Sequence, residues 1–234
     1  MEIEILLSCM NQKDLSIVEK NNIKTKATII NQCDKDDYSE VVVNNNTIKV
    51  VSSTQRGLTN SRNLALIHAS GDVCLLSDDD VVYKDDYKER IAEAFSKLSD
   101  ADIIIFDINR LNYERKIKPL TEIRVAPKFK SYGSVRIAFK RESIQKNNIW
   151  FNRNFGSGSV FTSGEETLFL NESRRKKLKI YEYPAIIADV DFSESTWRSG
   201  YDEKFFYDKG ALLAAAWIGN PFLDKFIPNI KLHS

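Results

Sequence analysis

Three consecutive carboxylates, Asp78-Asp79-Asp80, follow the apolar run at residues 73–76. Carboxylates this close repel one another and raise one another's pKa values unless a cation neutralises them. Mg²⁺ and Mn²⁺ prefer oxygen ligands, and Mg²⁺ usually takes one or two protein carboxylates together with substrate phosphates. If extended geometry continues, Asp78 and Asp80 project to the same side and are the predicted metal ligands. The alternative is a solvated acidic turn or the cap of the next helix.

Two arginines, Arg56 and Arg62, lie on either side of the expected start of a helix over residues 57–69. A helix N-terminus carries unpaired N–H groups and about half a positive charge, so it favours an anionic phosphate. Arginine adds a permanent charge that binds phosphate oxygens in pairs. The pattern indicates an anion site upstream of the acidic triplet, with two ordinary surface arginines as the equal alternative.

A second acidic pair, Glu165 and Glu166, opens an expected helix over residues 165–176, after a loop rich in Gly, Ser, Asn and Phe at residues 151–163. The helix dipole favours carboxylates in a first turn, so capping alone explains such a pair. A carboxylate near a substrate hydroxyl can instead act as a general base, which contributes about 10²–10⁴ in rate. Both glutamates are therefore candidate bases.

Composition and missing motifs exclude several classes of protein. The only histidines are His68 and His233, which disfavours a Ser-His-Asp hydrolase or a multi-histidine zinc site. The sequence has no P-loop pattern, and no G-x-G-x-x-G follows its first expected strand. A formal net charge of +1 gives no sign of a nucleic-acid partner. The three cysteines form no C-x-x-C pair and are expected to be reduced thiols.

Apolar runs alternate with helical patterns over residues 1–108. The expected strands include residues 3–7, 26–32, 73–76 and 103–108, and the expected helices are residues 15–23, 57–69 and 87–98. This alternation favours an α/β fold with a mainly parallel sheet, whose ligands bind beyond the carboxyl ends of its strands. The second half is more basic, with expected strands at residues 135–139 and 179–183, and ends in an expected helix over residues 205–218. No repeat or linker marks a boundary, so we expect one domain over residues 1–234.

The sequence also gives expectations about location. Glu2 and Glu4 stand where a secretory signal would carry basic residues. The longest apolar stretch near the C-terminus, residues 211–217, is shorter than the roughly 20 residues that cross a bilayer. We therefore expect a cytoplasmic protein. The basic run at residues 174–177 favours either peripheral contact with the anionic inner face of a membrane or a solvated helix end.

Taken in order, these motifs resemble those of family-2 glycosyltransferases of GT-A fold, in their bacterial, inverting form. The resemblance rests on G-x-x-x-S-R-N-L-A at residues 57–65, A-S-G-D-V at 69–73, L-L-S-D-D-D at 75–80 and S-G-E-E-T-L-F-L at 163–170. It spans the chain from the first strand to about residue 209. F-F-Y-D-K-G at residues 205–210 also resembles a C-terminal stretch of some bacterial members.

The resemblance implies a GT-A, Rossmann-like fold and transfer of a sugar from a nucleotide-diphosphate donor to an acceptor hydroxyl. Asp78 and Asp80 take the place of the family's D-x-D, which holds Mn²⁺ or Mg²⁺ against the donor diphosphate. Glu166 matches the catalytic carboxylate of the family's G-E-D motif, here Glu in place of Asp, and Glu165 is the alternative. Residues 1–108 would bind the nucleotide sugar, and residues 109–234 would bind the acceptor.

Further donor contacts are implied for Asp34 and Arg56 near the nucleoside, for Arg62 near the phosphates or the carboxylate cluster, and for Asp78 with Asp79. The implied donor is a UDP-sugar. The implied acceptor is a saccharide or lipid-linked saccharide of cell-surface polysaccharide or glycolipid synthesis.

Some details depart from the family or fit other classes. Some GT-A enzymes place a metal-binding histidine near residues 191–197, where this chain offers only Asp191 or Glu194 as replacements. Four aromatic residues are candidates for stacking on sugar rings, with core packing as the alternative: Trp150, Phe151, Phe155 and Trp197. The D-x-D-x-V pattern at residues 78–82 also fits a HAD-type phosphatase, in which the first Asp is a nucleophile. A non-catalytic sugar-nucleotide or carbohydrate-binding module is the third alternative.

Overall fold

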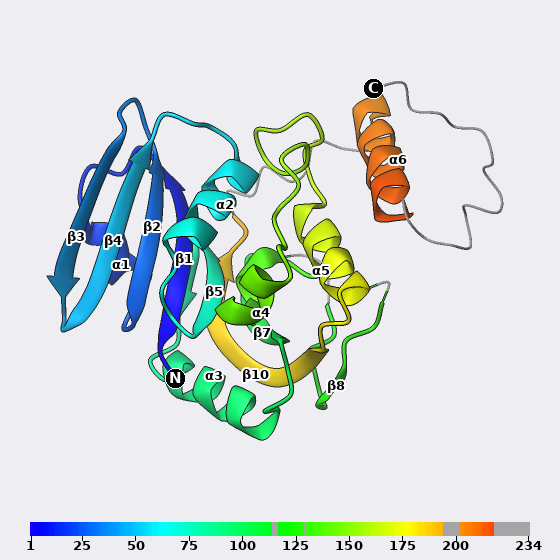
Figure 1. Cartoon of the computed structure of the whole chain (residues 1–234), viewed down its shortest axis with the longest axis horizontal. Helices are drawn as coiled ribbons and strands as arrows, with labels where there is room; N and C mark the ends of the chain where they lie inside the picture. The colour runs from blue at the N-terminus through cyan, green and yellow to red at the C-terminus, as the bar shows by residue number, and fades with distance from the viewer. Residues whose placement is uncertain (114–116, 129, 194–201, 218–234) are drawn as a thin grey trace.

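The chain folds as a mixed α/β structure with a central sheet flanked by helices (Figure 1). The computed structural model describes residues 1–113, 117–128, 130–193 and 202–217. The order of the sheet is β3-β4-β2-β1-β5-β9-β7-β10-β6, and β8 pairs with β10. The expected α/β fold is confirmed. No helix within the described ranges combines the length and the apolar composition of a membrane span.

The strands and helices have the following bounds. The strands are β1 (Ile3–Met10), β2 (Lys26–Gln32), β3 (Asp37–Val43), β4 (Asn46–Ser53), β5 (Val73–Asp78), β6 (Val81–Tyr83), β7 (Ile103–Leu111), β8 (Arg124–Val125), β9 (Ile137–Lys140) and β10 (Ile180–Asp191). The helices are α1 (Ser16–Lys20), α2 (Leu58–His68), α3 (Tyr87–Lys97), α4 (Arg141–Lys146), α5 (Glu165–Arg175) and α6 (Glu203–Trp217), with a 3₁₀ turn at Ser134–Arg136.

Most strands of the sheet run parallel, and both halves of the chain add antiparallel strands. Strands β4, β2, β1 and β5 run parallel, as do β7 and β10. Strand β9 lies antiparallel between β5 and β7, and β3, β6 and β8 also pair antiparallel. Because the carboxyl ends of β1, β2, β4 and β5 share one edge, the residues that follow these strands meet there.

Two hydrophobic cores sandwich the sheet. Along β1, Ile5 and Leu7 belong to the core that includes residues of α1 and α3, whereas Leu6 belongs to the core that includes residues of α2, α4 and α5. This alternation follows from the two-residue period of a strand. Burying each such side chain stabilises the fold by about 1.5–3 kcal/mol. The edge formed by the carboxyl ends of β1, β2, β4 and β5 therefore belongs to a sheet that is packed on both faces.

Three elements of the second half differ from expectation. The strand expected at residues 135–139 begins as the 3₁₀ turn, and only Ile137–Lys140 pairs. The strand expected at residues 179–183 continues as β10 to Asp191, because the register shifts between Glu182 and Ala188 accommodate Pro184. The last helix, expected at residues 205–218, is α6, Glu203–Trp217.

Candidate active site

The acidic triplet lies at the carboxyl end of β5, where the strand gives way to a turn. Asp78 is the last residue of β5, and Asp79 and Asp80 form the turn before β6. The extended geometry that would place Asp78 and Asp80 on one side of a strand therefore ends at Asp78. The end of α1 holds the turn, because Asn21 Nδ2 donates to the carbonyl of Asp78 at 3.1 Å and Lys20 Nζ donates to that of Asp79 at 3.0 Å.

Arg62 joins the acidic triplet to the acidic pair of α5. Its Nη2 lies 3.3 Å from Asp78 Oδ1, and its Nη1 lies 2.9 Å from Glu165 Oε1 and 3.5 Å from Glu166 Oε1. The Arg62 side chain is only 2% exposed. Of the two positions that the sequence left open for it, Arg62 takes the one in the carboxylate cluster. Arg62 thus reaches Glu165 across 103 positions of the sequence.

The N-terminus of α2 is covered by the glycine-rich loop at residues 151–163. The Leu58 N–H donates to the carbonyl of Ser157 at 2.9 Å, and Gly57, the N-cap residue, has a φ of 105° that favours glycine. Because a loop carbonyl takes this N–H and carboxylates enclose Arg62, the helix start is not the open phosphate site expected from Arg56 and Arg62.

The buried cluster carries an excess of negative charge, with three carboxylates around one arginine. Burial alone would lower the pKa of Arg62, but these carboxylates raise it above its ordinary value, so the guanidinium stays charged. Burial and the neighbouring Glu165 raise the pKa of Glu166 well above its ordinary value, although Arg62 opposes the shift. Glu166 is therefore protonated more readily than an exposed glutamate.

The two glutamates of the pair differ in access to solvent. The Glu165 side chain is 0% exposed and that of Glu166 is 13% exposed. Within the described residues, Glu165 Oε2 and Arg62 Nε are buried without a hydrogen-bond partner. Glu165 is therefore enclosed, and Glu166 keeps access to the outside.

Sequence reasoning missed Ser134, which also contacts the cluster. Its Oγ donates to Asp78 Oδ2 at 3.1 Å, and the residue is 5% exposed. Ser134 lies in the 3₁₀ turn, 56 residues after Asp78. No local pattern marks it, because only the antiparallel insertion of β9 next to β5 brings this turn to the site.

Asp34 and Arg56 lie on the same edge and pair with each other. Their side chains form an ion pair, 95% and 40% exposed respectively. Arg56 Nη1 also donates to the carbonyl of Gln32 at 2.6 Å. The predicted nucleoside residues are thus together and open to solvent. Within the described residues, no hydrogen bond or ion pair joins them to the Arg62 cluster.

The oxygen donors of the triplet fit a hard divalent cation. Asp80 is exposed, and desolvation with the charges of Asp78 and Asp79 raises its pKa to about 6, a repulsion that a cation would relieve. Among the described residues, no group of three or more His, Cys, Asp or Glu side chains converges as a metal site. The protein would supply two carboxylates, and phosphate and water oxygens the remaining ligands.

Two other sets of candidates are only partly placed. Asp191 accepts hydrogen bonds from Asn112 Nδ2 and the Ser193 N–H, both at 2.9 Å, and Glu194 lies outside the described residues. Of the aromatic residues, Phe151 and Phe155 are buried in the protein, so core packing explains them. Trp150 is 45% exposed, and Trp197 lies outside the described residues.

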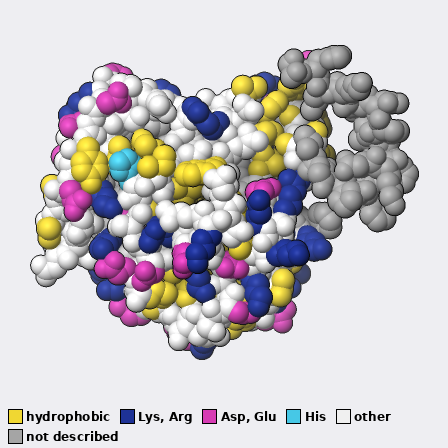
Figure 2. Space-filling model, in the orientation of Figure 1, with side chains coloured by type: hydrophobic (Ala, Val, Ile, Leu, Met, Phe, Trp, Pro, Cys, Tyr) yellow, Lys and Arg dark blue, Asp and Glu magenta, His cyan; other side chains and the backbone are white. Residues whose placement is uncertain are grey.

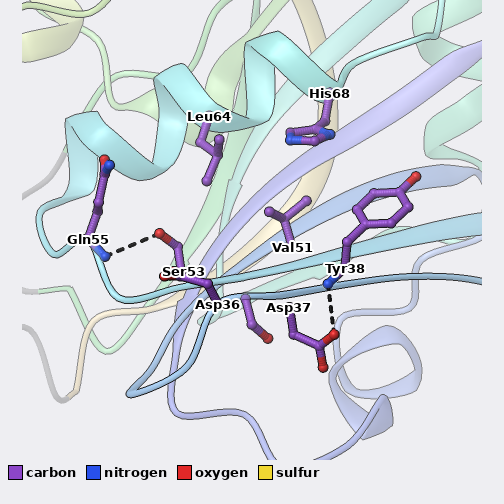
Figure 3. A pocket seen from close by; sticks show the side chains of 9 residues that line it. Asp36, Asp37, Tyr38, Val51, Ser53, Gln55, Leu64 and His68 are labelled. Atoms are coloured by element: carbon purple, nitrogen blue, oxygen red, sulfur yellow. Dashed lines mark hydrogen bonds between the residues drawn. The ribbon is translucent and has the colours of Figure 1, made fainter.

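A separate pocket of about 340 Å³ lies between the β3–β4 hairpin and α2 (Figure 3). Its lining residues are Asp36, Asp37, Tyr38, Val51, Ser52, Ser53, Gln55, Leu64 and His68. The His68 ring stacks on Tyr38 with centroids 5.7 Å apart. None of the predicted site residues lines this pocket.

Comparison with known proteins places this arrangement in a family. The family described as Glycosyl transferase family 2 matches residues 4–161, and no curated protein matches the chain. Among solved structures, TarS residues 1–349 from S. aureus in complex with UDP-GlcNAc is 15% identical over 99% of this chain and 77% of that one, with a TM-score of 0.65.

A second similar structure comes from another organism. Mannosyltransferase PcManGT from Pyrobaculum calidifontis, in complex with GDP-Man and Mn²⁺, is 11% identical over 98% of this chain and 65% of that one, with a TM-score of 0.56. At such identities the structures support the fold, and the family match covers more than half of the chain. The chain therefore belongs to glycosyltransferase family 2 and is a glycosyltransferase of GT-A fold.

Proposed function

We propose that the enzyme transfers a sugar from a UDP-sugar to an acceptor hydroxyl with inversion and depends on a divalent metal. The observation that carries this proposal is the contact of Arg62 with both Asp78 and Glu166, because it joins the expected diphosphate end and the expected base in one cluster. Membership of the family leaves the phosphatase and the non-catalytic module without support.

Asp78 and Asp80 would hold Mn²⁺ or Mg²⁺ together with the donor diphosphate. When bound, the cation supplies Lewis-acid stabilisation of the charge on the departing diphosphate, worth several kcal/mol. Asp34, Arg56 and Asp79 would contact the nucleotide. In this proposal residues 1–108 bind the nucleotide sugar, and residues 109–234 bind the acceptor, within one domain.

Glu166 is the proposed general base, and Glu165 is assigned to positioning. Glu166 is the more exposed of the two, whereas Glu165 is fully enclosed and holds Arg62 Nη1 at 2.9 Å. Ionised Glu166 would take the proton of the acceptor hydroxyl as its oxygen attacks the anomeric carbon. The attack comes from the face opposite the departing diphosphate, which inverts the configuration.

The choice of substrates follows the similar structures and the family. TarS was solved with UDP-GlcNAc and PcManGT with GDP-Man and Mn²⁺, so these two donors and Mn²⁺ are the first to test. The proposed acceptor is a saccharide or lipid-linked saccharide of cell-surface polysaccharide or glycolipid synthesis in a bacterium.

We also propose a cytoplasmic protein with peripheral contact at the inner face of the membrane. The basic run at residues 174–177 ends α5, where Lys176 and Lys177 are exposed. Lys and Arg are mixed with Asp and Glu over the face in Figure 2, so any such contact would be local. Sedimentation with phosphatidylglycerol vesicles should pull down the wild type and less of a Lys176→Gln, Lys177→Gln variant. Equal sedimentation of the two would contradict the assignment.

The function is tested by thermal unfolding with UDP-GlcNAc, UDP-glucose and GDP-mannose, each with and without Mn²⁺. A ligand at 100 times its Kd stabilises the folded state by about 2.7 kcal/mol. We expect a UDP-sugar to raise the unfolding temperature only with Mn²⁺ and to release UDP slowly. A chain that binds none of these donors, or binds them equally without metal, would contradict the proposal.

A further inference from the structure

The loop that leads into α5 is fastened to α6 by a buried carboxylate. Asp208 of α6 is 2% exposed. Its Oδ2 accepts the backbone N–H of Thr162 at 3.0 Å and the Thr162 hydroxyl at 2.7 Å, and its Oδ1 accepts Lys204 Nζ at 2.7 Å. Lys204 Nζ also donates to the carbonyl of Val160 at 3.1 Å. One carboxylate thus ties residues 160–162 to α6.

The charge of Asp208 is maintained by these partners. Burial alone would raise the pKa of Asp208, but Lys204 and Thr162 together lower it to about 2. The carboxylate is therefore ionised at physiological pH. Charge-assisted hydrogen bonds of this kind are roughly twice as strong as neutral ones.

A second contact with α6 involves Gly164, the residue immediately before α5. Gly164 has a φ of 110°, and a Cβ built there would lie 2.6 Å from Leu212 Cδ1 and Cδ2. Leu212 follows Asp208 by one helical turn, so the same face of α6 bears both contacts. Phe206 and Tyr207, which also belong to α6, are exposed. Hydrophobic side chains gather on the surface over α6 (Figure 2).

The opposite side of the loop rests on the buried cluster. A Cβ at Gly156 would lie 3.2 Å from both Glu165 Cδ and Thr59 Cγ2. The Gly156 N–H donates to the carbonyl of Phe161 at 2.8 Å, which closes the loop on itself. The loop is therefore held between α6 and Glu165, the residue next to Glu166, and it has little room to shift without moving Glu165.

We infer that Asp208 is a positioning residue for Glu166: by holding Thr162 it fixes the first turn of α5, and with it the proposed base. This inference rests on the proposed function and deepens it. It also assigns a role to the F-F-Y-D-K-G segment. Because a 1 Å misplacement of a reacting group can cost about 10²-fold in rate, release of the loop should reduce turnover more than donor binding.

The test compares Asp208→Asn with Glu203→Gln, an exposed carboxylate on the same helix, in the full chain with Mn²⁺. Hydrogen exchange of residues 160–168 reports on the loop, and calorimetry with UDP gives the Kd and the fraction of competent sites. Release of UDP from UDP-GlcNAc, normalised to that fraction, gives kcat and KM. Thr162→Val removes only the hydroxyl contact and serves as a milder variant if Asp208→Asn does not fold.

We expect Asp208→Asn to expose residues 160–168 to exchange and to lower kcat about 10- to 100-fold, with the UDP Kd and the donor KM within about twofold. Glu203→Gln should match the wild type. If hydrogen exchange in Asp208→Asn is unchanged, or is faster while kcat is unchanged, the positioning role is refuted. Turnover by the wild type would still uphold the proposed function in that case. A wild type that neither binds UDP nor releases it from UDP-GlcNAc refutes the UDP-sugar assignment and the catalytic role of Asp208 together, even if the exchange result holds.

Discussion

Replacing Arg62 by Met should expose how strongly the carboxylate cluster depends on its single cation. Arg62 is 2% exposed and contacts Asp78, Glu165 and Glu166 at 3.3, 2.9 and 3.5 Å. Removing one partner of a buried ion pair costs about 3–5 kcal/mol. Each kcal/mol shifts the unfolding temperature of a chain of this size by about 2–4 °C, so the expected loss is about 6–20 °C.

The loss should depend on pH. Arg62 opposes the rise in the pKa of Glu166, so without Arg62 the folded-state pKa of Glu166 lies further above its unfolded value, and stability is lost as pH rises and recovered as Glu166 protonates. Thermal unfolding at pH 8 and pH 5.5 measures this dependence. Arg56→Met is the control, because Arg56 pairs with the exposed Asp34 and such a pair contributes about 0–1 kcal/mol. Equal losses in the two variants, or an Arg62→Met deficit that is the same at both pH values, would refute the reasoning.

Three further predictions concern the site and the residue that leads into α5. Glu166→Gln should retain UDP binding and lower UDP release from the donor about 10²-fold or more. Because ionisation of a glutamate with a raised pKa costs stability, this variant should unfold at a higher temperature than the wild type at pH 8 but not at acid pH. Asp80→Asn should abolish the Mn²⁺-dependent part of the thermal shift with UDP, and a full shift would contradict the ligand assignment. Gly164→Ala should destabilise the fold by about 1–3 kcal/mol in urea unfolding, and Leu212→Ala should recover part of this loss if the steric contact is its cause.

Local patterns predicted the elements that carry the site. Strand β2 coincides with the expected residues 26–32, and α5 begins at Glu165 as expected. A short β-branched run and a glycine before a helix are both signals carried by neighbouring residues. The extended geometry assumed from Asp78 to Asp80 was wrong, because the pattern does not state where strand pairing stops. Strand β5 ends at Asp78, so the third aspartate lies in a turn.

The contacts that complete the site could not be predicted in this way. Ser134 reaches Asp78 across 56 residues, and Asp208 reaches Thr162 across 46. Such pairs depend on where β9 and α6 pack, which is a property of the whole fold and leaves no spacing to recognise. The same holds for Arg62, whose sequence position indicated a phosphate contact as readily as a carboxylate one.

Glu165 offers a test of whether the cluster is built for stability or for the reaction. Its Oε2 is buried without a partner among the described residues, and an unsatisfied buried polar atom costs about 1–3 kcal/mol. Its Oε1 nevertheless orients Arg62 Nη1, and that guanidinium also reaches Asp78 and Glu166. Glu165→Gln keeps the volume and removes one of three like charges, so it should raise the unfolding temperature at pH 8 and lower turnover. If Glu165 served stability alone, its replacement would lower the unfolding temperature and leave the turnover of the folded fraction unchanged.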